Sequence, residues 1–364
     1  SPPGSELAYC VIEQATSHGI EIDRSSPVIH DCAIRLNTNS TSGAGIYTNT
    51  SFTLQHCTIS NNTVSGAYGY GAGIFTDAPM TMRQDTFSGN AANANDGSAQ
   101  GGGIYSNASL RLFDCRVSNN IAYSYYWGWF GNNVSQGGGL YAWADTATVV
   151  MERCVVDDNT ATASAARVCS YSYGAGVFSN STLGACNTEI ARNQTYSNCE
   201  YNYGSGIYLA ARSAVLFNCT IAYNSHCGVG SYADSVTIWN SIVFFNNNGG
   251  AQICPPLSNV GYSDVQGVPV YPGEGNIRFH PLFASDTVLH IVPGSPCIDA
   301  GWALSGYNDV CFPPSLGGVR NDMGQDGGPG ACPGDERGLV AVDEPGSGAA
   351  ISISLAVAPN PTRG

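Results

Sequence analysis

The chain has 364 residues and a formal net charge of −14, and only 11% of its residues are charged. Low charge together with 45 glycines favours a turn-rich β protein over a helical one. The negative charge argues against nucleic acid as a partner, because phosphate contacts require a basic surface. No apolar run of about 18 residues is present, so we expect no membrane-spanning helix.

A repeat of uneven length runs along the chain. An apolar residue stands two positions after each reference position and another stands three positions before it, as Ile34 and Ile29 do around Cys32. Successive reference positions lie from 22 residues (Cys10 to Cys32) to 39 residues (Cys115 to Cys154) apart. A constant core with loops of variable length is typical of a solenoid. The reference positions, called anchors below, are Cys10, Cys32, Cys57, Asp85, Cys115, Cys154, Thr188, Cys219, Ser241 and Ser263.

The spacing around each anchor predicts several short strands in each turn of the solenoid. The anchor and the residue two positions later face the same side of one strand. The residue three positions before the anchor would point to the opposite side of the same strand. A bend must therefore separate it from the anchor if both side chains are to be buried. We therefore predict an all-β parallel β-helix of about ten turns, called rungs below.

Asparagine stands five residues after the anchor in eight successive rungs. Because Asn tolerates the left-handed conformation, we expect it to occupy a turn. In rungs stacked about 4.8 Å apart, the amides could also hydrogen-bond one another as a ladder. Isolated turn residues are the alternative, and eight in one register favour the ladder. The residues are Asn37, Asn62, Asn90, Asn120, Asn159, Asn193, Asn224 and Asn246.

A second register opens six central rungs with Gly-x-Gly, an apolar residue and an aromatic residue. It occupies residues 43–47, 71–75, 101–105, 137–141, 174–178 and 204–208. A dinucleotide-binding motif would be followed by a helix, whereas a period-two pattern follows here. We expect these glycines to supply tight turns and close contact between rungs.

The rung pattern resembles bacterial right-handed parallel β-helix proteins, including the repeats of polymorphic outer-membrane proteins. Residues 260–267, 280–283, 295–301 and 312–324 resemble the C-terminal part of surface proteins with a choice-of-anchor domain. Residues 351–364, with Pro-Asn-Pro after an apolar segment, resemble the start of a type IX secretion sorting domain. The resemblance implies a right-handed helix over residues 1–268, an irregular cap over 269–340, and a linker with a strand-like tail over 341–364. It also implies a processed piece of a longer secreted or cell-surface precursor.

The 14 cysteines fall into two groups. Those at anchors should point inward and remain mostly thiols, because side chains stacked in parallel register give poor disulfide torsions. The loop cysteines have no Cys-x-x-Cys or close Cys/His pair that would indicate zinc. Among them, Cys169 and Cys199 each lie five residues before a Gly-x-Gly start. We predict the disulfides Cys169–Cys199, Cys227–Cys254 and Cys311–Cys332.

Candidate catalytic residues are few. β-Helix enzymes that cut acidic polysaccharides cluster Asp with Arg, Lys or His on one strand face. The adjacent acids Asp157 and Asp158 precede a ladder Asn, so we expect Asp158 to serve the turn. His30 and His56 lie near anchors of successive rungs, where they could form a surface pair or play a structural role.

Acidic residues also gather near the C-terminus. Asp309, Asp322 and Asp326 lie among glycines in the expected cap. Hard oxygen ligands in such a segment could bind Ca²⁺, which is the one cofactor that the sequence suggests. The alternative is that these residues are solvated acids of the cap.

Aromatic residues gather just before successive Gly-x-Gly starts. In a solenoid these loops stack along one edge and would form an aromatic, Asn-rich strip. Such a strip can bind sugar rings or another protein. The alternative is that the loops pack on one another over the core, and exposure of the tryptophans would favour binding. The residues are Tyr68, Tyr70, Tyr125, Tyr126, Trp127, Trp129, Tyr171, Tyr173, Tyr201 and Tyr203.

Together these features predict a non-catalytic structural or adhesive protein of the cell surface or extracellular space. Its expected partners are further copies of itself, or cell-surface glycans or proteins. Open helix ends could stack head to tail into a fibre, and the tail could be donated to a neighbour. The alternatives are a carbohydrate-binding module that uses the aromatic edge, or a pectate-lyase-like enzyme that degrades polysaccharides.

Overall fold

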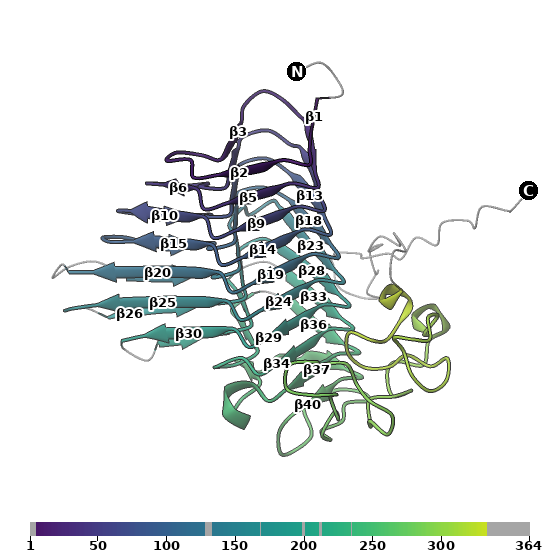
Figure 1. The fold of residues 1–364 in the computed structure, drawn as a ribbon. Coiled ribbons are helices and arrows are strands. Elements are labelled where there is room, and N and C mark those ends of the chain that lie inside the picture. The colour runs from purple at the N-terminus through teal and green to yellow at the C-terminus, as the bar shows by residue number, and fades with distance from the viewer. Residues whose placement is uncertain are drawn as a thin grey trace, which may run out of the picture.

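The computed structural model describes residues 5–127, 133–167, 169–198, 201–210, 213–233 and 235–332. They form a parallel β-helix with a two-layered wing on one side and an irregular segment beside its C-terminal rungs (Figure 1). Three sheets enclose the helix core, and two more form the wing. No helix in the described part of the chain is long and apolar enough to cross a membrane.

Sheets A, B and C form the walls of the helix, and every strand pair within them is parallel. Sheet A contains β1 (Glu6–Ala8), β4 (Val28–His30), β8 (Thr53–Gln55), β13 (Met80–Arg83), β18 (Leu110–Phe113), β23 (Thr148–Glu152), β28 (Thr182–Cys186), β33 (Ser213–Phe217), β36 (Ser235–Trp239) and β39 (Asn259–Gly261). Sheet B contains β2 (Val11–Glu13), β5 (Ala33–Arg35), β9 (Thr58–Ser60), β14 (Thr86–Ser88), β19 (Arg116–Ser118), β24 (Val155–Asp157), β29 (Glu189–Ala191), β34 (Thr220–Ala222), β37 (Ile242–Phe244) and β40 (Asp264–Val265). Sheet C contains β3 (Ile20–Ile22), β7 (Ile46–Thr48), β12 (Ile74–Thr76), β17 (Ile104–Ser106), β22 (Leu140–Ala142), β27 (Val177–Ser179), β32 (Ile207–Leu209), β35 (Val229–Ser231) and β38 (Ile253–Cys254). The 10 strands of sheet A and the 10 of sheet B confirm the predicted number of rungs.

The wing consists of sheets D and E. Sheet D contains β6 (Thr38–Asn39), β10 (Thr63–Gly66), β15 (Ala91–Ala94), β20 (Ile121–Tyr126), β25 (Thr160–Ala165) and β30 (Gln194–Ser197). Sheet E contains β11 (Gly69–Tyr70), β16 (Ala99–Gln100), β21 (Asn133–Gln136), β26 (Ser170–Tyr173) and β31 (Tyr201–Tyr203). The described helices are the short 3₁₀ segments η1 (Asn246–Gly249), η2 (Ser305–Tyr307) and η3 (Pro329–Ala331).

The core follows the predicted register. Anchor cysteines and the apolar residues around them are buried, as Cys57, Leu54 and Ile59 show. The residue before every anchor has a positive φ, for example 52° at His56, and makes the bend between sheets A and B. Where the anchor is polar, its oxygen accepts the backbone N–H of the anchor one rung earlier, as Asp85 Oδ1 does from Cys57 at 2.7 Å.

The asparagine ladder is confirmed. Each Nδ2 donates to the Oδ1 of the next ladder residue at 2.8–3.0 Å, from Asn37 to Asn246. The expectation that these residues are themselves left-handed is wrong. The residue before each of them has the positive φ, for example 54° at Asn61 and 55° at Asp158. The amide is thereby free to point inward and bond the next rung.

The Gly-x-Gly motifs have the structural role that was predicted. The first glycine has a positive φ, which is 53° at Gly71. A Cβ on the last glycine, Gly73, would lie 2.4 Å from the carbonyl oxygen of Gly103 in the next rung. These positions therefore need glycine for a turn and for close stacking.

The wing corrects the prediction that the segments between ladder and Gly-x-Gly are loops. Sheet D carries the chain outward from the ladder, and sheet E returns it to the glycine turn (Figure 1). The facing sides of the two layers carry small residues such as Ala94, Ala99 and Ala122, all of which are fully buried. Hydroxyls bridge the layers, as Ser124 Oγ and Ser135 Oγ do at 2.8 Å.

The C-terminal end of the helix is closed, so the prediction of open ends is wrong there. Gln252 ends the ladder, because its Oε1 accepts both the backbone N–H and the Nδ2 of Asn246 at 2.9 Å. Asn276 Oδ1 accepts the N–H of Ser263, the last anchor, and Leu257 and Tyr271 pack against the end of the core. The tail, residues 341–364, lies outside the described residues.

The segment after β40 also packs along the outer corner between sheets A and B. Asn218 Nδ2 donates to the carbonyl oxygens of Asp322 and Gly324 at 2.9 and 3.2 Å. Asn187 Nδ2 donates to the carbonyl oxygens of Gln325 and Gly327 at 3.0 and 2.6 Å. The cap is therefore fastened to the side of the helix as well as covering its end.

Candidate functional site

One group of the predicted aromatic residues lies in a corner between the wing and sheet C. Sheet C carries an outward row of six stacked rings, with centroids 4.9–5.5 Å apart and interplanar angles of 3–20°. The row consists of Tyr47, Phe75, Tyr105, Tyr141, Phe178 and Tyr208.

Tyrosines of sheet E pack against this row. Tyr70 lies 5.4 Å from Tyr105, and Tyr173 lies 4.8 Å from Tyr208 between ring centroids. Tyr173 also stacks on Tyr203 at 5.5 Å and on Tyr171 at 6.3 Å. Burial raises the pKa of Tyr105 and of Tyr173 to about 12.

The corner therefore attaches the wing to the helix. The faces of the rings in this corner pack against one another, so they are not available to stack on a ligand. For Tyr70, Tyr173 and Tyr203 the structure supports the alternative of packing over the core.

The outer face of sheet D has a different character. Alternate residues of β20 and the residue beyond it point outward: Ile121 is 40% exposed, Tyr123 37% and Trp127 67%, with Tyr125 half-buried between them. Tyr125 contacts Trp127 edge to face at 5.3 Å. Tyr196, on β30 of the same face, is 52% exposed. We call this surface, defined by Ile121, Tyr123, Tyr125, Trp127 and Tyr196, the wing face.

Small polar side chains flank the wing face. The strand register places Ser65, Asn93, Tyr123, Thr162 and Tyr196 in one row across sheet D. Ser164 stands opposite Tyr125 in the next row outward. The surface thus combines exposed rings with hydroxyl and amide groups.

The remaining predicted aromatic residues are divided. Tyr68 is 52% exposed and stacks on Tyr70 at 6.1 Å. Tyr126 ends β20 and is half-buried. Trp129 and the side chain of Tyr201 lie outside the described residues.

The predicted site residues do not include three members of the wing face, Ile121, Tyr123 and Tyr196. Tyr123 and Tyr196 share a face with Trp127 only because their segments are strands in register. The period-two pattern of residues 121–127, in which Ile, Tyr, Tyr and Trp alternate with smaller residues, is the signal that could have found Tyr123.

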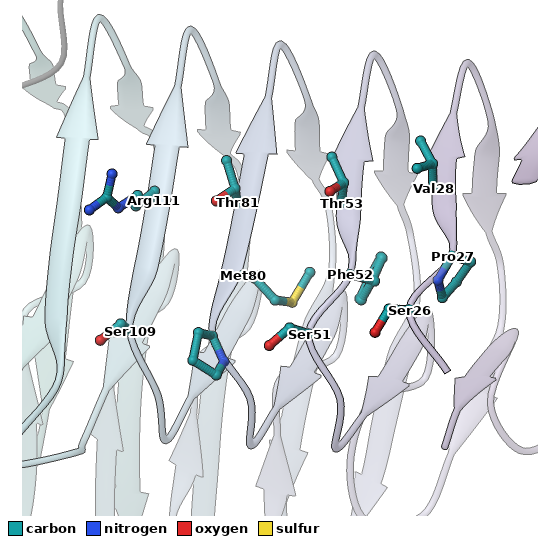
Figure 2. Close-up of a pocket in the computed structure, with 11 residues that line it drawn as sticks. Ser26, Pro27, Val28, Ser51, Phe52, Thr53, Met80, Thr81, Ser109 and Arg111 are labelled. Carbon is teal, nitrogen blue, oxygen red and sulfur yellow. The ribbon is translucent and has the colours of Figure 1, made fainter. Parts of the chain in front are cut away.

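A groove of about 410 Å³ crosses four rungs on the outside of sheet A (Figure 2). Figure 2 shows Val28, Thr53, Thr81 and Arg111 in one row, one from each rung. A second row is mainly serine, and Phe52 and Met80 lie between the two. Arg111 is the one charged residue of the 11 that line the groove, so it contains no acid–base pair.

A neighbouring hollow of about 480 Å³ contains His30 and His56. His30 does not pair with His56: its Nε2 contacts Glu6 Oε1 at 2.6 Å and its Nδ1 contacts Asp31 Oδ2 at 2.7 Å. Hydrogen bonds to these carboxylates raise the pKa of His30. Because both ring nitrogens are occupied, His30 is held in a structural bridge between two rungs.

The acid pair beside the ladder is also structural. Asp157 is 1% exposed and pairs with Arg116 and Arg192 from the neighbouring rungs. Burial raises its pKa, and the arginines oppose that shift. Asp158 occupies the left-handed turn position at φ 55°, as predicted.

The predicted Ca²⁺ ligands are buried, so the alternative of solvated acids is wrong. Asp322 accepts the N–H groups of Asp299 and Leu316, both at 2.7 Å. Asp309 accepts the N–H of Asp322 at 3.1 Å, and Asp326 accepts that of Ile291 at 2.9 Å. No group of three or more His, Cys, Asp or Glu within the described ranges could hold a metal ion. The structure therefore does not support the Ca²⁺ prediction and gives these carboxylates backbone partners instead.

The cysteines follow the predicted division except Cys186, which was expected in a loop but lies in β28 as a buried thiol. Cys227–Cys254 and Cys311–Cys332 are disulfides, with Cα atoms 6.0 and 5.5 Å apart. Cys169 is disulfide-bonded, and its predicted partner Cys199 lies outside the described residues. The anchor cysteines are thiols: Cys10, Cys32, Cys57, Cys115, Cys154 and Cys219.

Comparison with known proteins agrees with this architecture. A family model described as "Right handed beta helix region" matches residues 3–87. The fold is a right-handed parallel β-helix. The β-helix is also similar to a solved structure titled "Crystal structure of pectate lyase Pel9A", with 13% identity and a TM-score of 0.28 over 86% of this chain and 87% of that one. At that identity and score the likeness carries no argument about activity. No curated protein matches the chain.

Proposed function

We propose that this β-helix is a non-catalytic adhesive protein of the cell surface or extracellular space, and that the wing face is its contact surface. The observation that carries the proposal is the row of exposed rings on β20. Ile121 and Tyr123 on β20, and Trp127 directly after it, are each at least 37% exposed. Exposed apolar surface of this kind marks interaction sites.

The other aromatic residues of the wing strengthen this reading by contrast. Tyr70, Tyr173 and Tyr203 of sheet E pack against the ring row of sheet C. Among the described residues, the rings of the wing face share one ring contact, the edge contact between Tyr125 and Trp127. A wing whose only role was mechanical would not need rings on its solvent side.

An extracellular location is supported by the disulfides. Cys227–Cys254 and Cys311–Cys332 are of a kind that persists in oxidising compartments. The resemblance to choice-of-anchor surface proteins and to a type IX sorting domain points the same way. The closed C-terminal end speaks against a fibre built by head-to-tail stacking, so adhesion rather than polymerisation is proposed.

The test is a cell-adhesion assay with beads coated with the full chain. The wild type should adhere to a panel of intact bacterial cells, and the double variant Tyr123→Ser/Trp127→Ser should not. Trp143→Ser is the matched control, because Trp143 is 48% exposed but lies beyond β22, away from the wing face. Equal adhesion of the wild type and the double variant would refute the proposal.

A further inference from the structure

We infer that the ligand of the wing face is an uncharged polysaccharide, bound along β20. This inference rests on the proposed contact surface and names the chemistry that it recognises. It starts from the composition of the wing strands, because the charges of a surface decide which polymers can approach it.

None of the 11 strands of sheets D and E contains Asp, Glu, Lys, Arg or His. The whole chain carries 13 basic and 27 acidic residues, so its charges lie elsewhere. The charged residues two positions before the wing strands β25 and β30, Asp158 and Arg192, are paired with each other at 3.4 Å. A charged polymer would therefore find no counter-charge on the wing strands.

The net charge of −14 argues further against an acidic polymer, which the protein as a whole repels. A basic partner would be drawn to carboxylates, which the wing strands lack. The described charged residues of the wing, Asp96 and Arg167, lie in turns beyond its strands. An uncharged ligand therefore suits the strand surface best.

The arrangement of groups favours sugars over a protein. A sugar ring presents an apolar face to an aromatic ring and hydroxyls at its rim, and rings with polar tips suit such surfaces. The register places Asn93 and Thr162 on either side of Tyr123, and Ser164 beside Tyr125. Neighbouring strands lie about 4.8 Å apart, so hydroxyl and amide groups flank the rings within hydrogen-bond reach of a bound sugar. Protein interfaces bury their anchors in a desolvated core and keep polar groups mainly at the rim, whereas polar side chains here stand directly beside the rings.

The length of the surface suits an oligosaccharide. Residues 121–127 extend over about 20 Å at about 3.3 Å per residue. Their outward side chains recur every second residue, which makes a linear track across the wing. A chain lying on this track would run along one rung, at right angles to the helix axis (Figure 1).

The test is affinity electrophoresis of the full chain in native gels that contain one polysaccharide each. Neutral probes are mannan, xyloglucan and β-1,3-glucan, and acidic probes are polygalacturonate and hyaluronan. At least one neutral polymer should retard the wild type, with less than a twofold change in affinity between about 0.05 and about 0.5 M NaCl. Trp127→Ser should weaken this binding at least tenfold, and Trp143→Ser should not change it. Circular dichroism of each variant checks that the fold is intact.

Retardation by acidic polymers alone, or affinity that falls steeply with salt, would overturn the inference. So would the absence of binding to any neutral polymer. If Tyr123→Ser/Trp127→Ser nevertheless abolishes adhesion to cells, the contact surface stands and its partner is a protein. If that variant adheres like the wild type, the proposed function itself fails.

Discussion

Removing one side-chain amide from the middle of the asparagine ladder should destabilise the helix far more than removing the side chain of the preceding residue in the chain. Asn120 is fully buried. Its Oδ1 accepts the backbone N–H of Asn90 at 3.1 Å and the Nδ2 of Asn90 at 2.9 Å. Its Nδ2 donates to the carbonyl oxygen of Phe87 and to Asn159 Oδ1 at 2.9 and 3.0 Å.

The substitution Asn120→Ala removes all four of these hydrogen bonds. The N–H of Asn90 then loses its acceptor and the carbonyl of Phe87 loses this donor, inside a core that water does not reach. A buried polar group left without a partner costs about 1–3 kcal/mol, so the stranded N–H of Asn90 alone costs about 1–3 kcal/mol. This is a large part of the total stability expected of a folded chain, about 5–15 kcal/mol.

The matched control is Asn119→Gly. Asn119 is exposed and has a φ of 56°, which glycine adopts without strain. The free energy of unfolding of the Asn119→Gly variant should stay within about 0.5 kcal/mol of the wild-type value. Urea denaturation followed by circular dichroism measures both variants. If Asn120→Ala lies within about 1 kcal/mol of Asn119→Gly, the ladder does not hold the rungs together as argued.

Three further predictions concern the cap and the thiols. Burial raises the pKa of Asp309 to about 7 and of Asp322 to about 6, above the unfolded value of about 3.9. The stability that their neutral forms contribute is fully present below about pH 4 and is lost as the pH rises through about 6–7. The Tm should therefore fall as the pH rises through that window, and the fall should be smaller in the variant Asp309→Asn. The same dependence of Tm on pH in the variant and the wild type would contradict the raised pKa of Asp309. Alkylation of the native protein, measured by mass spectrometry, should modify the half-buried Cys10 and spare Cys57, because burial raises the pKa of Cys57 to about 12. Rapid labelling of Cys57 would show that the core is open. The substitution Asn218→Gly keeps the left-handed turn but removes the Nδ2 group that donates to the cap. The rate of amide hydrogen exchange in residues 320–330 should therefore rise, while that in the rungs stays unchanged. Equal exchange in the variant and the wild type would mean that other contacts hold the cap.

The helix itself could be predicted because its information is local and repeated. The alternation around the anchor recurs in all ten rungs and the ladder Asn in eight of them, so register alone identified the core, the ladder and the anchor thiols. The prediction placed the left-handed conformation at Asn62 and its equivalents, whereas the residue before each of them, such as Asn61, adopts it. The error arose because the two adjacent residues share one turn. A spacing pattern cannot tell which of the two bends the backbone.

The wing could have been predicted only in part. In β25, the residues Thr160–Ala165 alternate as strands do, but their buried members are alanines. An alanine face carries little hydrophobic signal, so the segment reads as a polar loop. The division of the aromatic residues between the packed corner and the wing face depends on strand register, which emerges only when the segments are paired.

A cap over residues 269–340 was predicted, but its contacts with the side of the helix were not, for a different reason. Asn218 and Asn321 are hydrogen-bonded at 3.0 Å although they lie 103 residues apart in the sequence. No local pattern records a contact of that range. Acids such as Asp322 therefore looked like surface ligands, whereas their partners are backbone N–H groups of the folded cap.

The most direct test of the wing face as the functional surface is hydroxyl-radical footprinting of the full chain with a neutral polysaccharide that retards it. The account predicts protection of Tyr123, Tyr125 and Trp127, with no change at Trp143 or along the groove of sheet A. Protection at the exposed groove residues Val28 and Arg111, with Tyr123 and Trp127 still reactive, would contradict it.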